Sequence, residues 1–182
     1  IAENAVNNAA VKTITLPSSL KVIGKNAFAQ SGLTAVVIPN GVTSIGSGAF
    51  RGATALESAT LPNAIEIIEA ATFKDCLKLA KIVIPAAVQI VSADAFAGCK
   101  ALASVELGAV KEIEQYAFAG CETLKEITLP ATVETVDAVS FYGCTGLQAI
   151  NVDEGNAKFK SVDGVVLVAN GDEEPVFDTL AI

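Results

Sequence analysis

Residues 79–102 read LAKIVIPAAVQIVSADAFAGCKAL, and this stretch decides the fold because it recurs along the chain. The copies share the template L-x-x-I-x-I/L-P-x-x-V-x-x-I-x-x-x-A-F-x-G-C-x-x-L. Its phenylalanines stand 22 or 23 residues apart, at Phe28, Phe50, Phe73, Phe96, Phe118 and Phe141. A unit this short cannot fold alone, so each copy must bury its apolar face against its neighbours. The repeat therefore predicts a solenoid.

The first half of each copy has the alternation of a short strand. Leu79-x-x-Ile82-x-Ile84 is a clear example, and its last residues alternate between inward and outward positions. Proline follows directly in five of the six copies, and Gly108 replaces it in the other. Because proline has no N–H to donate, it ends the ladder at the same place each time. The pattern predicts short parallel strands in register, with one face inward.

The second half of each copy fits neither one strand nor one long helix. Val88 and Val91 are three residues apart, and Ala95-Phe96 follows four and five residues later. We expect a second strand or extended turn that leads into a short helical or 3₁₀ turn at the Ala-Phe segment. The predicted class is therefore an α/β solenoid of about six repeats. Its phenylalanines should stack inside, one ring per copy, at roughly the 4.7–4.9 Å spacing of strands.

The combined motif resembles the BspA-type leucine-rich repeat family. The resemblance rests on Leu-x-x-Ile-x-Ile-Pro, Val-x-x-Ile and Ala-Phe-x-Gly-Cys-x-x-Leu, which are clearest from Leu79 to Leu124. It covers about residues 11–152. The resemblance implies a right-handed leucine-rich-repeat array. It also implies a bacterial cell-surface or secreted protein with a part in adhesion and host interaction, because most members of that family are of this kind.

The repeat pattern divides the chain into three parts. Residues 1–10 resemble the second half of a copy, residues 11–152 hold the six repeats, and residues 153–182 leave the pattern. The start inside the pattern indicates a processed or trimmed piece without its export signal. We find no apolar run long enough to span a membrane.

The last part predicts a cap for the open end of the core. Asp163-Gly164 between valine-rich arms is typical of a type I′ hairpin, and capping units must present a polar outer side. We expect a solvated loop over residues 170–175 and one more strand over residues 176–182. The family resemblance supports the hairpin, because members often follow their repeats with a segment matched here by Asn156, Phe159, Ser161, Asp163, Gly164 and Val165.

Four cysteines share one column of the template: Cys76, Cys99, Cys121 and Cys144. An even number in a protein suspected to be exported favours disulfides, and stacking brings neighbouring Cα atoms near bridging distance. Parallel side chains in a line are nevertheless poor geometry for a bridge, and Ser31 and Ala53 occupy the same column elsewhere. A ladder of buried free thiols is the favoured interpretation. Disulfides or reactive thiols are the alternative.

Composition and charge argue against several classes of function. The 182 residues include 12 basic and 20 acidic side chains, for a net charge of −8, and no histidine. Scattered basic residues supply neither the stripe that nucleic acid requires nor a polybasic membrane patch. Without histidine, Ser-His and Cys-His nucleophiles and His-containing metal centres are excluded. We expect a protein that is not an enzyme and that has no cofactor or metal.

One acidic position leaves an alternative open. Glu69, Glu114 and Asp137 share a template position, and the last two would lie on adjacent copies. Two such carboxylates could share a calcium ion. A solvated edge is the favoured interpretation.

The natural binding surface is the outward side of the first strands. Its two rows hold mostly small, β-branched or hydroxyl residues, which also suit a flat sheet. They lack the Tyr, Trp or Arg anchors of tight interfaces, so a contact there would be weak, extended or multivalent. The candidate face consists of Thr15, Val37, Thr60, Val83, Glu106, Thr128 and Asn151 from one row, with Lys81 and Glu126 from the other.

Two functions remain open. The first is a surface or secreted adhesion module that contacts a host protein, matrix or glycan, with no nucleic-acid partner and no membrane insertion of this segment. The second is a structural spacer or stalk within a larger exported protein, with no ligand of its own.

Overall fold

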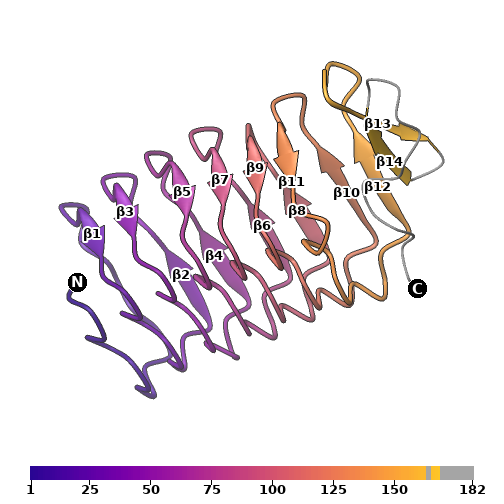
Figure 1. The fold of residues 1–182 in the computed structure, drawn as a ribbon. Helices are drawn as coiled ribbons and strands as arrows, with labels where there is room; N and C mark the ends of the chain where they lie inside the picture. Colours follow the sequence, from indigo (N-terminus) through magenta and orange to yellow (C-terminus); the bar gives the residue numbers. More distant parts are fainter. Residues whose placement is uncertain (163–164, 169–182) are drawn as a thin grey trace.

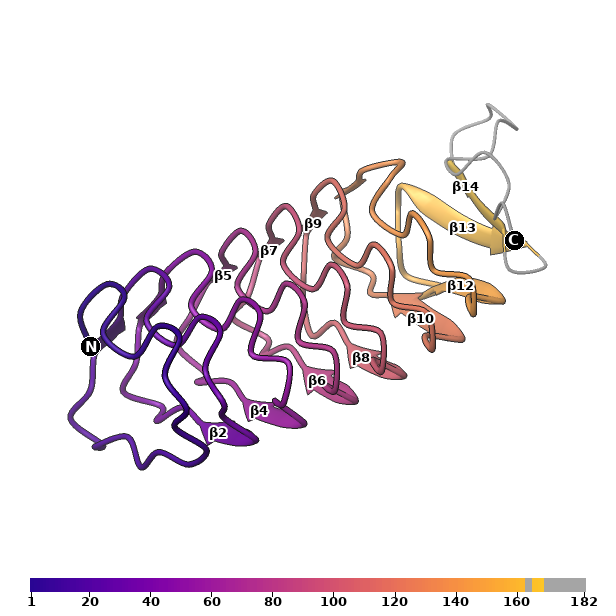
Figure 2. The ribbon, with the colours of Figure 1, turned by 90° about the horizontal axis from the view of Figure 1, so that it is seen from below.

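The chain winds into an elongated parallel β-solenoid whose successive turns, here called rungs, stack along one axis (Figure 1). The structure is a computed structural model and describes residues 1–162 and 165–168. Each full rung contributes one strand to each of two rows, which run along different sides of the solenoid (Figure 2). The first row contains β2 (Ala35–Val37), β4 (Ser58–Thr60), β6 (Lys81–Val83), β8 (Ser104–Glu106), β10 (Glu126–Leu129) and β12 (Ala149–Val152). The second row contains β1 (Val22–Ile23), β3 (Ser44–Ile45), β5 (Ile67–Ile68), β7 (Ile90–Val91), β9 (Glu112–Ile113) and β11 (Thr135–Val136).

Residues at the same template position face one another in neighbouring rungs. Ile82 on β6 pairs in parallel with Val105 on β8, and the other strand pairs of both rows keep the same register. Within β6, Lys81 and Val83 are exposed, whereas Ile82 is buried in the core. The ladder ends just before the proline, where the N–H of Ile84 donates to the carbonyl of Glu106 at 2.8 Å. The predicted short parallel strands with one inward face are confirmed.

None of the described residues forms a helix, so the helical or 3₁₀ turn predicted for the second half of each rung is wrong. The N–H groups of Asp94, Phe96 and Gly98 donate to the next rung at 3.1, 2.7 and 2.7 Å, whereas the residues between them donate within their own rung. A helix would keep all of these bonds inside the segment. Two of the residues whose N–H groups point to the next rung, Asp94 and Gly98, have positive φ values of 59° and 73°. The fold is therefore a parallel β-solenoid of leucine-rich-repeat type and not an α/β structure.

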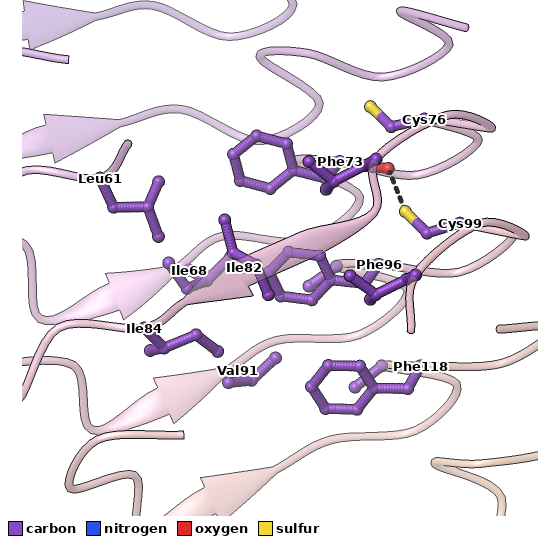
Figure 3. Close-up of a cluster of buried hydrophobic side chains, with 14 of the residues drawn as sticks. Leu61, Ile68, Phe73, Cys76, Ile82, Ile84, Val91, Phe96, Cys99 and Phe118 are labelled. Atoms are coloured by element: carbon purple, nitrogen blue, oxygen red, sulfur yellow. Dashed lines mark hydrogen bonds between the residues drawn. The ribbon is translucent and has the colours of Figure 1, made fainter. Parts of the chain in front are cut away.

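The six phenylalanines form one continuous stack through the core, as predicted. Neighbouring rings are parallel within 9°, and their centroids are 5.3 to 5.6 Å apart. Figure 3 shows Phe73, Phe96 and Phe118 in this stack, beside aliphatic side chains of both strand rows. The spacing is longer than the expected 4.7–4.9 Å, because parallel rings favour an offset that lengthens the distance between centroids.

The four cysteines are free and buried in a second column. The thiol of Cys99 donates a hydrogen bond to the carbonyl of Phe73 at 3.1 Å (Figure 3). Cys76 and Cys144 make the same contact with Phe50 and Phe118. Each thiol thus ties its turn to the phenylalanine of the preceding rung. The favoured free-thiol ladder is confirmed, and the disulfide alternative is wrong for this structure.

The first ten residues follow the same hydrogen-bond pattern. The N–H of Val6 donates to the carbonyl of Ala27 at 2.7 Å, as the N–H of Phe28 does to Ala49 at 2.7 Å. Val6 therefore stands in the phenylalanine column and packs against the core with a smaller side chain.

The repeats are followed by the predicted hairpin. Strand β13 (Phe159–Val162) pairs in antiparallel fashion with β14 (Val165–Val168), so the connection is two residues long. Both strands lie against β12 (Figure 1). The Asp163-Gly164 turn, the loop over residues 170–175 and the strand over residues 176–182 lie outside the described residues.

Asn156 joins this hairpin to the last full rung. Its Nδ2 donates to the carbonyls of Pro130 and Val133 at 3.0 Å each, and its Oδ1 accepts from the N–H groups of Lys158 and Phe159 at 2.8 Å each. The side chain is only 9% exposed. Because all four hydrogen-bonding positions of a buried amide are satisfied, this asparagine stabilises the departure from the repeat.

The ring stack predicts that Phe96→Ala will cost roughly 3–5 kcal/mol of stability, because Phe96 is fully buried between two rings. Urea unfolding followed by circular dichroism would measure the change. Tyr142→Ala is the matched control, since that ring is 71% exposed. A Phe96→Ala variant as stable as the Tyr142→Ala variant would contradict the stack.

The thiol column predicts that Cys76 and Cys99 do not react with an alkylating or disulfide reagent in the native protein, and that four free thiols are found in denaturant. Burial raises the pKa of Cys99 from 9.0 to about 12 and raises the pKa of Cys76 well above its ordinary value. Fewer than four thiols in denaturant would restore the disulfide alternative.

The same pKa shift predicts a loss of stability at alkaline pH. As pH rises, the unfolded chain releases its thiol protons near 9.0, before folded Cys99 does near 12. The folded state then holds more protons, so the free energy of unfolding falls across this interval. A Cys99→Ala variant should show a shallower fall when both proteins are unfolded in urea at a series of pH values, and an unchanged slope would count against the shift.

Candidate binding face

The residues predicted as a binding face all lie on the solvent side of the first row. Strand alternation turns them outward, opposite the buried residues of the same strands. Thr15 precedes β2, in a segment with no assigned strand, and the others lie on the strands of the row. The structure therefore gathers these exposed side chains on one surface: Thr15, Val37, Thr60, Lys81, Val83, Glu106, Glu126, Thr128 and Asn151.

Two valines are the most prominent apolar groups of this face. Val37 is 69% exposed and Val83 is 48% exposed. Thr60 stands between them on β4, so three β-branched side chains follow one another along the row. At the N-terminal end the same face is hollowed into a shallow groove of about 550 Å³, lined by residues that include Thr13, Thr15, Leu16, Ala35 and Val37. The surface is apolar enough to be covered by a partner and too open to enclose a small molecule.

A single ion pair crosses the middle of the face. The Nζ of Lys81 on β6 lies 2.6 Å from Oε1 of Glu106 on β8, and both side chains are more than half exposed. The pair is diagonal, because Lys81 itself pairs with Ser104 in the register. An exposed pair of this kind contributes roughly 0–1 kcal/mol to stability. Its two charges can therefore be engaged by a partner at little cost to the fold.

The acidic position of the second row is held by backbone contacts. Oε2 of Glu114 accepts from the N–H of Ala93 at 2.7 Å, and Oδ1 of Asp137 accepts from the N–H of Val139 at 3.0 Å. Within residues 1–162 and 165–168 there is no group of three or more metal-ligating side chains. Glu114 therefore caps a turn of the preceding rung, and Asp137 caps its own turn.

Sequence reasoning assigns no role to the one pair of exposed aromatic rings among the described residues. Tyr116 and Tyr142 stand on successive rungs with ring centroids 6.3 Å apart, edge to face. Both lie in turns and not on the strands of the candidate face. Apart from Val139, their columns hold small, polar or charged residues in the other rungs, and this departure from the repeat is the signal that could have singled them out.

The described part of the chain has no helix that could cross a membrane.

No curated protein matches the chain significantly. Solved structures that share its fold include the following two, each more than 30% identical. A leucine-rich repeat protein of Eubacterium ventriosum is 31% identical over 73% of this chain and 37% of its own length, with a TM-score of 0.70. The leucine-rich repeat protein of T. pallidum is 34% identical over 78% of this chain and 67% of its own length, with a TM-score of 0.71. The chain thus spans little more than a third of the Eubacterium protein.

The family model for the BspA-type leucine-rich repeat region matches residues 1–103 and 101–162, in six copies. The match takes in both strand rows, the phenylalanine and cysteine columns and the Asn156 segment described above. On this evidence, the chain belongs to the BspA-type leucine-rich repeat family.

Proposed function

We propose that this chain is a non-enzymatic interaction module, exposed on a bacterial surface or secreted, that binds a host protein, matrix or glycan through the outward face of its first strand row. The observation that carries the proposal is the continuous exposed row in which Val37 and Val83 flank Thr60. Exposed apolar side chains that follow one another on a rigid sheet favour contact with a partner. Family membership supports the surface location.

The chemistry of the face favours a weak contact repeated many times. Its residues are small or β-branched, and its charges are limited to a few side chains such as the Lys81–Glu106 pair. Tight interfaces concentrate their binding energy in aromatic or arginine anchors, which this face lacks. A flat face of this kind gains strength when many modules act together on one surface.

The alternative proposal is a structural spacer within a longer exported protein. The observation that favours it is that four lysines pair with acidic side chains of neighbouring rungs. These pairs add little to stability, but they join neighbouring rungs and need no ligand. The two proposals differ in whether saturable binding exists.

The proposal predicts saturable binding to a subset of spots on a glycan and matrix-protein array, and we expect Glu106→Lys to weaken that binding several-fold. This substitution places two like charges at the centre of the face and leaves the core intact. Lys81→Glu combined with Glu106→Lys restores the ion pair with reversed polarity and should recover part of the binding if the pair positions the face.

Glu122→Lys is the matched control. Glu122 forms a similar exposed pair with Lys100 at 2.8 Å, outside the candidate face, so it makes the same charge change elsewhere. Equal losses for both variants would show that net charge matters and not the face. Absence of saturable binding to every spot would favour the spacer.

A further inference from the structure

An asparagine–glycine pair occupies an exposed turn directly after β2. Residues 39–42 form the turn, in which the N–H of Val42 donates to the carbonyl of Pro39 at 2.9 Å. Asn40 is exposed. The N–H of Gly41 has no hydrogen-bond acceptor among the described residues. Its nitrogen is thus a backbone amide that no hydrogen bond holds in place, next to an asparagine side chain.

The side-chain carbonyl of Asn40 is polarised by the next rung. Its Oδ1 accepts a hydrogen bond from the backbone N–H of Asn63 at 3.2 Å. A fixed N–H donor at this oxygen would stabilise negative charge that develops there during attack on the side-chain carbon. The register of the solenoid therefore supplies an activating contact that residues 39–42 do not contain themselves.

A cation stands close to the same turn. The Nζ of Lys21 lies 3.5 Å from where a Cβ of residue 41 would be. A nearby positive charge favours the deprotonated form of a neighbouring group. Lys21 is thus placed to assist loss of the Gly41 proton and to stabilise an anion formed beside it.

We propose that Asn40 is a site of spontaneous covalent modification, at which it cyclises onto Gly41 and becomes aspartate or isoaspartate. Solvent base removes the Gly41 N–H proton, and the nitrogen forms a bond to Cγ of Asn40. The bond from Cγ to Nδ2 breaks, and ammonia leaves with a proton from water. Water then opens the succinimide at either carbonyl, which yields aspartate or isoaspartate at position 40.

The two products affect the solenoid differently. Aspartate keeps an oxygen for the N–H of Asn63, so the inter-rung bond survives and a negative charge is added. Isoaspartate inserts one more backbone atom between positions 40 and 41 and disturbs the turn closed by Val42. The change lies three residues after Val37, at the edge of the candidate binding face.

The next rung contains a natural control. Asn63 has the same template position but is followed by Ala64, whose Cβ hinders approach to its nitrogen. No backbone N–H donates to Oδ1 of Asn63 among the described residues. Asn63 therefore shares exposure and location with Asn40 but lacks the features that promote cyclisation.

The test is ageing of the folded chain at mildly alkaline pH, followed by trypsin digestion and mass spectrometry. Cleavage after Lys25, Arg51 and Lys74 separates Asn40 and Asn63 into peptides 26–51 and 52–74. We expect conversion at Asn40 to exceed conversion at Asn63 by roughly tenfold or more, the ratio produced by about 1.4 kcal/mol of barrier. The rate should rise with pH, and an isoaspartyl methyltransferase should label peptide 26–51 after ageing.

Two variants separate the chemistry from general instability. Asn40→Gln should abolish conversion at position 40, since the larger ring forms far more slowly, and Lys21→Met should slow conversion at Asn40 several-fold while leaving Asn63 unchanged. Equal rates at Asn40 and Asn63 would overturn the proposal. Conversion of Asn40 in denaturant but not in the folded chain would also overturn it, because the folded turn would then be protective.

Discussion

The backbone hydrogen bonds that run from each rung to the next are the constraint on which the rest of the structure depends. In the turns, alternate N–H groups such as those of Asp94, Phe96 and Gly98 donate across the rung boundary. In the strands the parallel ladder does the same. These bonds leave no freedom in register, so residues of one template position must stack directly. The ring stack, the thiol column and the outward rows are all consequences of that register.

This constraint separates stability from recognition. Burial of the phenylalanine stack and of the aliphatic columns supplies the apolar driving force, and the inter-rung bonds satisfy the backbone inside it. The outward side chains of the first row contribute little to apolar burial or to the backbone hydrogen bonds. They can therefore differ from rung to rung, as Val37, Thr60, Val83 and Glu106 do in one column, without altering the fold. The proposed binding function uses this freedom, because it places recognition on that face.

The strands, the ring stack, the thiol ladder and the hairpin were predictable because each depends on which side chains need burial or on local turn chemistry. The helical turn was predicted wrongly because the spacing of Ala95 and Phe96 suits a tight coil, and spacing does not say where a backbone N–H points. A signal was present in the glycine column, since Gly52, Gly98, Gly120 and Gly143 all adopt positive φ. Glycine at one template position is typical of a left-handed residue, which a helix interior does not use.

By itself, the amino-acid sequence determined the period and the identity of the buried columns, because apolar periodicity records which positions avoid water. It also favoured free thiols, and its resemblance to the family indicated the segment around Asn156. The tertiary structure alone decided which rung accepts each turn N–H, that Lys81 and Glu106 meet diagonally, that Tyr116 contacts Tyr142, and that Asn63 donates to Asn40. The physical reason is that these contacts join residues about 21 to 26 positions apart, and their geometry exists only after neighbouring rungs have stacked in register.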